Sequence, residues 1–104
     1  MFARSVSIHL KSNMLSDYTR TFENDTLPLL RQQKGFKDEI TLSNPGSLDV
    51  IAISLWESKA NAETYNTNTY TQVLRTLERM IDGAPKVQTF EAVTSTFHKL
   101  AVAA

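Results

Sequence analysis

The amino-acid sequence predicts an α+β fold of the ferredoxin-like type, a βαββαβ protomer with an antiparallel sheet and its helices on one face. Three observations support this prediction. Stretches with alternating apolar residues, typical of strands, are interspersed with stretches whose apolar residues recur every three or four positions, typical of helices. Their order is strand, helix, strand, strand, helix, strand, which is the split β-α-β plan. A turn sequence at residues 43–47, containing Pro45 and Gly46, joins the two central strands into a hairpin.

The size and composition are those of one soluble domain. We expect residues 1–104 to form a single domain, because 104 residues suffice for one core but not two. Eleven basic and eleven acidic side chains give no net charge, which argues against nucleic acid as a partner. The chain has no cysteine, no signal-peptide pattern at its start and no apolar stretch of membrane-spanning length. We therefore expect a cytoplasmic protein with no membrane partner.

The first half of the chain is predicted to form a strand and a helix. One side of the strand at residues 2–10 carries Arg4, Val6, Ile8 and Leu10, and the other carries Ala3, Ser5, Ser7 and His9. We expect the first, mostly apolar side to face the helices. The helix follows, with Ser12, Asn13 or Ser16 as its cap. Pro28 predicts a kink or a short break before Leu29, and Gly35 is placed for the left-handed position that ends a helix.

The two central strands are predicted at residues 36–43 and 48–56. In the second of them, Ile51, Ile53 and Leu55 form a bulky apolar side, and Ala52, Ser54 and Trp56 form a side of small residues with one large ring. Because bulky aliphatic side chains favour a core, we expect the isoleucine side to face the helices. The tryptophan side would then lie on the open face of the sheet.

The second half is predicted to form a helix and a long strand. Ser58 is placed as an N-cap for a segment that ends near Tyr65, because the polar residues 66–69 compete for backbone hydrogen bonds. A second helical segment begins near Thr69. Residues 82–85, with a glycine and a proline, end it. Alternation over residues 86–99 predicts the last strand.

A sheet with helices on one face leaves its other face uncovered. The expected open face, with the small polar side of the first strand and Trp56, is neither hydrophilic nor a complete core. A second copy packed sheet to sheet would cover it and leave a lined cavity between the copies. The sequence therefore predicts a homodimer.

Four short motifs connect the sequence to a known family. They are Lys34-Gly35-Phe36, the run from Ile53 to Lys59 followed by Ala62, the run Tyr70-Thr71-Gln72-Val73-Leu74, and Pro85 leading into Val87–Glu91. With these motifs the chain, from about Phe2 to His98, resembles the antibiotic biosynthesis monooxygenase superfamily. The resemblance implies a single domain of that type that dimerises as an α+β barrel. The superfamily contains cofactor-independent quinone-forming monooxygenases and haem-degrading enzymes.

The resemblance implies roles for individual residues. Trp56 matches a tryptophan that lines the pocket at the end of the third strand. The haem-degrading branch has a histidine four residues after an aromatic residue in the second helix, and here Leu74 follows Tyr70 at that spacing. We therefore expect no haem, and no other cofactor is implied. For the quinone-forming branch, His9, Ser54 and Tyr65 are candidates to hold a phenolic substrate.

The candidate site therefore consists of His9 and Trp56 as catalytic residues and Ser7, Ser54 and Tyr65 as substrate-binding residues. Trp56 has a structural alternative, because a tryptophan at a strand end commonly fills a core, and we expect His98 to be a surface or interface residue. The two histidines, His9 and His98, lie on separate strands, without the spacing of a metal site, so no metal is expected.

Two functions of different classes follow. The first is a cofactor-independent monooxygenase that acts on a small aromatic or phenolic substrate in a pocket between sheet and helices. In it the ionised substrate gives an electron to O₂, while the protein supplies desolvation and orientation. The second is a non-catalytic dimeric module that binds a ligand or takes part in a stress response. Trp56 and His9 side by side in one closed pocket would favour the first, and a lumen filled by side chains would favour the second.

Overall fold

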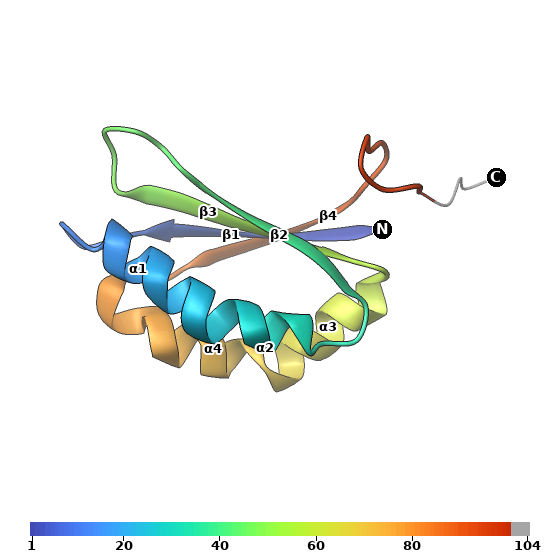
Figure 1. Ribbon diagram of the computed structural model, residues 1–104, viewed down its shortest axis with the longest axis horizontal. Helices are drawn as coiled ribbons and strands as arrows, with labels where there is room; N and C mark the ends of the chain where they lie inside the picture. The colour runs from blue at the N-terminus through green and yellow to red at the C-terminus, as the bar shows by residue number, and fades with distance from the viewer. Residues whose placement is uncertain (101–104) are drawn as a thin grey trace.

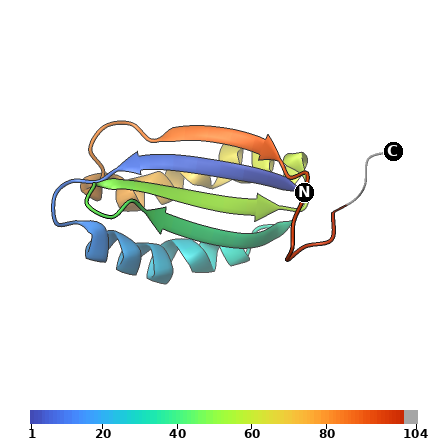
Figure 2. The ribbon, with the colours of Figure 1, turned by 90° about the horizontal axis from the view of Figure 1, so that it is seen from above.

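The computed structural model describes residues 1–100, and its centre is one four-stranded sheet. The strands are β1 (Phe2–His9), β2 (Phe36–Ser43), β3 (Asp49–Trp56) and β4 (Lys86–Glu91). They lie in the order β2-β3-β1-β4, and each strand is antiparallel to its neighbours (Figure 2). This is the predicted ferredoxin-like arrangement, in which the first and third strands occupy the centre of the sheet.

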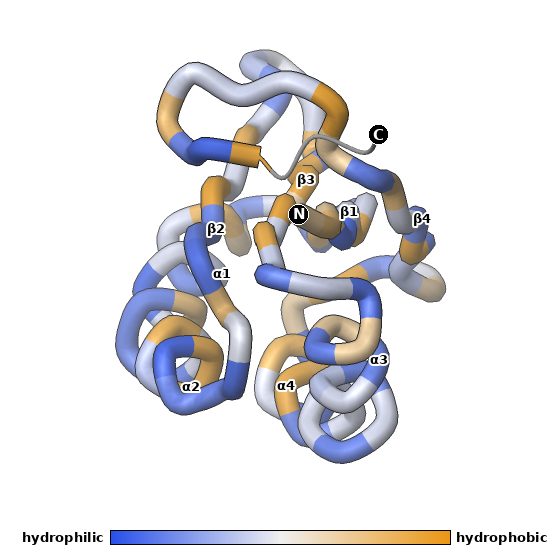
Figure 3. Tube along the Cα trace, turned by 90° about the vertical axis from the view of Figure 1, so that its right-hand side faces the viewer, coloured by the Kyte–Doolittle hydropathy of each residue, from blue (hydrophilic) through white to orange (hydrophobic). Residues whose placement is uncertain are grey.

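All helices cover the same face of the sheet (Figure 1). The first helical stretch consists of α1 (Leu15–Thr21), a π-helical segment η1 (Phe22–Thr26) and α2 (Leu27–Arg31). The second consists of α3 (Lys59–Asn68), α4 (Tyr70–Leu77) and a short 3₁₀ segment η2 (Glu78–Met80). The two stretches lie side by side beneath the sheet, and hydrophobic residues of the strands lie above them (Figure 3).

The irregularity expected near Pro28 takes the form of the π-helical segment. Proline has no N–H to donate to the carbonyl four residues earlier, so the regular ladder cannot pass through it. Just before it, the backbone N–H of Leu27 donates to the carbonyl of Phe22, five residues back. The helix thus accommodates Pro28 by widening over one turn, and this widened turn carries Thr26 inward, where it is 2% exposed.

The helix boundaries agree with the sequence in part. Ser58 caps α3 as expected, because its Oγ accepts a hydrogen bond from the backbone N–H of Asn61 at 3.2 Å. The helix does not end near Tyr65 as predicted but continues to Asn68, with the interruption at Thr69. The predicted side-chain cap of the first helix is also wrong. Met14 is the N-cap of α1 and makes no capping bond, while Asn13 takes a positive φ of 62° in the turn before it.

The last strand is shorter than predicted, ending at Glu91 instead of near Lys99. Within the described residues β4 pairs only with β1. The first residue of β1, Phe2, pairs with Glu91, so β4 has no partner beyond this point. One further bond joins the Ala92 N–H to the carbonyl of Met1 at 2.9 Å. The chain then crosses toward β2, where the His98 ring contacts the carboxylate of Asp38 (Figure 2).

The two sides of β3 are the reverse of the prediction. Val50, Ala52, Ser54 and Trp56 face the helices and are buried, whereas Ile51 is 39% exposed on the open face. The register with β1 decides this: Trp56 pairs with Phe2 and Ala52 with Val6. Directly paired residues of antiparallel strands project to the same face, so the correctly assigned side of β1 fixes the side of β3.

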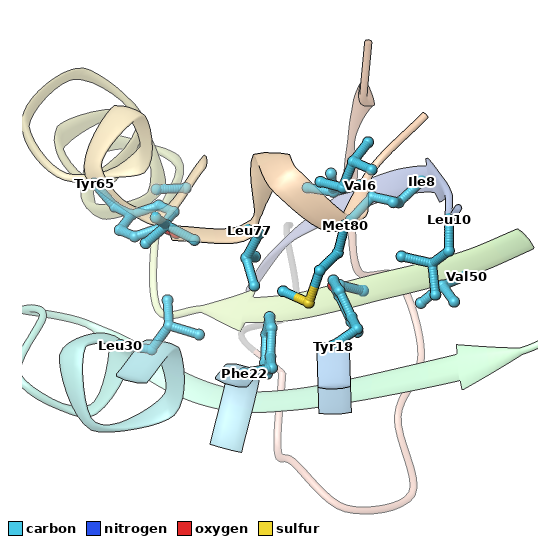
Figure 4. Packing of buried hydrophobic residues seen from close by; sticks show 14 of the residues in the cluster. Val6, Ile8, Leu10, Tyr18, Phe22, Leu30, Val50, Tyr65, Leu77 and Met80 are labelled. Atoms are coloured by element: carbon cyan, nitrogen blue, oxygen red, sulfur yellow. The ribbon is translucent and has the colours of Figure 1, made fainter. Parts of the chain in front are cut away.

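The core lies between the sheet and the helices (Figure 4). In that view Tyr18 and Phe22 from the first helical stretch approach Met80 and Leu77 from the second, beneath the side chains of β1. Tyr18 and Trp56 are among its largest fully buried side chains, with 1% and 0% exposed. The predicted inward side of β1 is confirmed, since Arg4, Val6, Ile8 and Leu10 are all buried.

Candidate functional site

A small cavity remains inside this core, between the sheet and both helical stretches. Its volume is about 40 Å³, which is room for about three water molecules. Most of its lining is apolar and comes from Val6, Ile8, Phe22, Leu30, Ala52, Val73, Leu74 and Leu77. The polar lining residues are Arg4, Tyr18, Thr26, Glu39, Ser54, Tyr65 and Tyr70. An enclosed apolar space with a few convergent polar groups is typical of small-molecule sites.

Arg4 brings a positive charge into this cavity from the centre of β1. The residue is 3% exposed, and its Nη2 donates to Asn66 Oδ1 on α3 at 2.8 Å. The guanidinium carbon lies 3.9 Å from the ring centre of Tyr70 and 5.3 Å from that of Tyr65. Within residues 1–100, no carboxylate lies within 4 Å of the guanidinium nitrogens. An amide and two aromatic faces therefore hold a buried cation that has no anionic partner there.

A row of aromatic rings supports Arg4 from behind. The rings of Trp56 and Tyr65 are tilted with centres 5.0 Å apart, and those of Tyr65 and Tyr70 are 6.2 Å apart. Trp56 Nε1 donates to Ser54 Oγ at 2.9 Å, which satisfies the buried indole. Contacts of this kind restrict each ring to one orientation, so Tyr65 and Tyr70 are held in place beneath the guanidinium.

Three buried hydroxyl groups around the cavity have no hydrogen-bond partner. They are Tyr18 Oη, Thr26 Oγ1 and Tyr70 Oη, each without a donor or acceptor in the described part of the chain. Leaving a buried hydroxyl unpaired costs about 1–3 kcal/mol. All three belong to residues that line one cavity, but their oxygen atoms are covered in this structure, so water or a ligand group would reach them only after the wall moves.

Burial keeps the tyrosines of the cavity in their neutral, proton-donating form. Desolvation is the main cause in each case: it raises the pKa of Tyr65 to about 12 and that of Tyr18 further still. The pKa of Tyr70 is also raised by burial, although the positive charge of Arg4 and the nearness of its N–H donors to the phenol oxygen oppose the change. At neutral pH all three hydroxyls therefore carry a proton and can donate a hydrogen bond.

Glu39 on β2 lies where the cavity meets the molecular surface. Burial raises the pKa of its carboxyl group, while a hydrogen bond from Thr41 Oγ1 at 2.7 Å lowers it in part. An outer groove of about 250 Å³ runs between α1 and β2, and Tyr18, Phe22 and Glu39 line both this groove and the cavity. These three side chains thus separate the enclosed space from the outside.

The fold of this chain is similar to that of known proteins, although its sequence is not. No family sequence model and no curated protein sequence matches the chain. Solved structures do match. SnoaB, a cofactor-independent oxygenase from Streptomyces nogalater, superposes with a TM-score of 0.76 at 11% identity, covering 93% of this chain and 97% of that one. An antibiotic biosynthesis monooxygenase superposes with a TM-score of 0.72 at 12% identity, covering 90% and 100%.

The chain has the antibiotic biosynthesis monooxygenase fold. A protein of unknown function from Nitrosomonas europaea shares it, with a TM-score of 0.77 at 13% identity over 94% of each chain. Identities of this size show the fold alone, and one fold supports many functions. Function in this chain must therefore be argued from its own residues.

Within this fold, the structure brings three of the five predicted site residues together. Ser54 and Tyr65 line the cavity, and Trp56 contacts both from the layer behind them. Trp56 faces the helices, not the open face as expected, because the two sides of β3 are exchanged.

The other two predicted residues lie on the opposite face of the sheet. His9 is at the far end of β1 from Trp56, and its Nδ1 lies 2.8 Å from Asp49 Oδ1. Ser7 and His9 border an open groove of about 530 Å³. In one protomer, then, Trp56 and His9 are not side by side. Their catalytic roles and the substrate-binding roles stay predictions.

Of the polar residues that line the cavity, Ser54 and Tyr65 were predicted as site residues, whereas Arg4 and Glu39 were not. A signal for Arg4 was present, because an arginine alternates with Val6 and Ile8 on the side assigned to the core. Glu39 had none, since its partner residues come from distant helices. Among residues 1–100, no three metal-binding side chains of His, Cys, Asp or Glu gather, and no helix there is long and apolar enough to cross a membrane.

Proposed function

We propose that the protein is a cofactor-independent monooxygenase acting on a small aromatic or phenolic substrate bound between sheet and helices. One observation carries the proposal: a buried cation, Arg4, and a carboxyl group, that of Glu39, line the same mostly apolar cavity. The fold shared with a cofactor-independent oxygenase supports it. The chemistry requires a substrate anion in a desolvated space, and these two residues supply the means to form and hold one.

The first step is proton transfer to Glu39. Its carboxylate takes a proton from the phenol of a hydroquinone, or from the acidic CH₂ group of an anthrone-like substrate. Burial raises the pKa of Glu39, which makes its carboxylate a stronger base than an exposed one. The resulting phenolate or enolate lies near the Arg4 guanidinium, whose charge stabilises it in the low-dielectric interior.

The second step uses O₂ as the oxidant. For an anthrone-like substrate, the anion gives one electron to O₂, and the two radicals join to form a carbon–oxygen bond. Glu39 returns its proton to the peroxide anion. The hydroperoxide formed then loses the second proton of the original CH₂ group together with hydroxide, leaving a carbonyl and restoring the carboxylate of Glu39. One oxygen atom enters the substrate and the other leaves as water. The four electrons come from the two C–H bonds, so no further reductant is needed.

The predicted site residues have places in this scheme. Tyr65 and Ser54 line the cavity against the substrate, and Trp56 holds both in position. Ser7 and His9 lie outside this cavity, so a role for His9 as the base would require a substrate on the open face.

We propose further that the protein is a homodimer, with the open face of the sheet as the interface. Ile40 and Leu42 of β2, Ile51 of β3 and Phe90 of β4 are each between 39% and 55% exposed there. The register places Ile40 beside Ile53 and Leu42 beside Ile51, which makes the apolar surface continuous across two strands. Such a surface is typical of an interface.

The small volume of the cavity favours a second candidate, a non-catalytic dimeric module that binds a ligand. A volume of about 40 Å³ does not admit an aromatic ring without movement of its wall. A protein that only holds a small ligand, or water, needs no such movement.

Oxygen consumption distinguishes the two candidates. The assay uses a panel of hydroquinones and anthrone-like phenols with wild type, Glu39→Gln, His9→Ala and Trp56→Phe. We expect turnover by wild type and His9→Ala, with about a hundredfold or greater loss in Glu39→Gln. Trp56→Phe should give an intermediate loss, since it keeps a ring but not the bond to Ser54. Absence of turnover by wild type over the whole panel would favour the binding module.

A further inference from the structure

We propose that the cavity binds the anionic oxygen of a small organic acid or ionised phenol, with Arg4 as its charge partner and the hydroxyls of Tyr18, Thr26 and Tyr70 as additional donors. This inference deepens the proposed function and rests on it for the location of the site. It states the charge of the ligand, which a catalytic assay alone does not establish.

In the described part of the chain, Arg4 has N–H donors without a partner and a charge without a counter-ion. A guanidinium group has five N–H donors, and the hydrogen bond to Asn66 Oδ1 uses one of them. The residue is 97% buried, although it also borders an outer groove of about 140 Å³ together with Asn66 and Glu63. A buried charge is normally paired, and within the described residues 1–100 no carboxylate pairs with this one. An anion in the cavity would complete it.

The hydroxyl groups near Arg4 can donate hydrogen bonds to the same anion. Tyr18 and Thr26 are 1% and 2% exposed, and their hydroxyls have no partner in the described residues. Like Tyr70, they can donate a proton to a lone pair. One cation and three O–H donors thus belong to the residues around a single space, and once the wall of the cavity moves to expose them they suit negative charge.

Glu39 is the one acidic side chain in this lining. Its charge would oppose an anion until it takes up a proton, and burial raises its pKa, which makes that uptake easier. In the proposed reaction it becomes neutral as it takes the proton of the substrate. The site therefore exchanges a negative charge on Glu39 for one on the substrate, and Arg4 faces one anion at a time.

Size limits what enters. The closed cavity accepts a group as small as a carboxylate, whereas an attached ring must extend into the outer groove of about 250 Å³. Tyr18 and Phe22, which line both spaces, must swing apart for this. Phe22 belongs to the π-helical turn, where the helix already departs from the regular ladder.

The test is an NMR titration of the full chain with four probes at equal ionic strength. Two are anions, formate and benzoate, and two are neutral amides of matched shape, formamide and benzamide. A fifth probe, 4-nitrophenol titrated across its ionisation, separates a phenolate from a carboxylate as the preferred source of the charge. We expect shifts at Arg4, Tyr18 and Tyr70 with the anions, which should bind about thirtyfold more tightly than their amides.

Variants locate the effect. Arg4→Met keeps the length of the side chain and should abolish the preference for the anion, whereas Arg75→Met, an exposed arginine on α4, should leave it unchanged. If Arg4→Met fails to fold, Tyr70→Phe decides: it removes only an unpaired hydroxyl, and we expect about tenfold weaker benzoate binding in a stable protein. Equal binding of anions and amides, no binding at all, or an unchanged preference in these variants would overturn the inference.

The outcome separates this inference from the proposed function. Anion binding at Arg4 without oxygen consumption would support the inference and remove the oxygenase. Binding of formate but not benzoate would also support it, and would count against an aromatic substrate. Oxygen consumption that is unaffected in Tyr70→Phe and Arg4→Met would support the oxygenase and overturn the anion site.

Discussion

Arg4 occupies a position that strand patterning assigns to an apolar side chain. Moving an unpaired charge into a protein interior costs several kcal/mol, so it persists only where something offsets the cost. Asn66 and the ring of Tyr70 do so in part. The part of the cost that these contacts do not offset destabilises the fold locally. Functional sites commonly carry such a cost, because activity there requires groups that do not favour stability. A charged residue in an otherwise apolar alternation is therefore informative about function as well as fold.

Glu39 should make the stability of the protein depend on pH. Its pKa is raised in the folded state above the ordinary value of 4.5. The favoured folded form is thus the protonated one, and its contribution to stability is complete below the ordinary pKa and is lost as pH rises through the folded pKa. The facing residue, Tyr18, stays neutral over this range. Glu39→Gln should therefore gain stability relative to wild type as the pH rises through that window.

Urea unfolding of both proteins between about pH 4 and about pH 7 measures this difference. Glu57→Gln, at an exposed position, is the matched control and should follow wild type throughout. A constant difference between Glu39→Gln and wild type at every pH would show that the carboxyl group titrates normally, and would weaken its assignment as the base.

At the scale of elements, β3 shows what a single sequence could and could not predict. Both sides of this strand carry apolar residues, and the bulkier side was assigned to the core. The pairing of Trp56 with Phe2 and of Ala52 with Val6 fixes the opposite orientation. Because successive side chains of a strand point to opposite faces, assigning one residue to the wrong face assigns every residue of the strand to the wrong face. Composition alone does not resolve this choice when both faces of a sheet carry apolar residues.

The other element errors have the same origin in tertiary contacts. β4 was predicted to continue to Lys99 because the alternation continues, but a strand needs a partner and β1 begins at Phe2. α3 continues past Tyr65 because the ring of that residue is anchored in the core. Ser54, Tyr65 and Trp56 of the predicted site lie together at the cavity, and their roles stay predictions. Arg4 and Glu39 approach one cavity only once the sheet and helices are assembled.

The connection between the first helical stretch and β2 depends on Gly35. This residue has φ of +78°, and a Cβ added to it would lie 2.7 Å from Asn61 Cβ at the start of α3. Gly46 has φ of +80° in open space and is the matched control. Gly46→Ala should lose about 1–2 kcal/mol from the backbone conformation alone.

Gly35→Ala should lose more, because the clash with Asn61 adds to the same backbone cost. Thermal or urea unfolding of the two variants measures the difference between them. Equal losses would mean that α3 moves away without cost, and that the approach of this turn to α3 does not constrain the site.

At the scale of the whole molecule, the uncovered face of the sheet is the main reason to expect a homodimer. The ferredoxin-like order of elements was predicted correctly and leaves one face without helices. With the two sides of β3 exchanged, this face is more apolar than the sequence analysis expected, since it carries Ile51, Ile53 and Leu55. The reason to expect a dimer is therefore stronger than before. The cavity with Arg4 lies on the other side of the sheet, so each protomer keeps its own site.

Charge placed on the open face should dissociate the dimer without disturbing that site. Ile40→Glu introduces a carboxylate at a position 55% exposed in the protomer, where the single chain tolerates it. In a sheet-to-sheet interface the same carboxylate would be desolvated without a partner, at a cost of several kcal/mol for each copy. Size-exclusion chromatography with light scattering at micromolar concentration should show a dimer for wild type and a monomer for the variant. Leu15→Glu, 46% exposed on α1, is the control and should remain a dimer. A monomeric wild type would contradict the assembly, whereas dissociation by Leu15→Glu alone would place the interface on the helices.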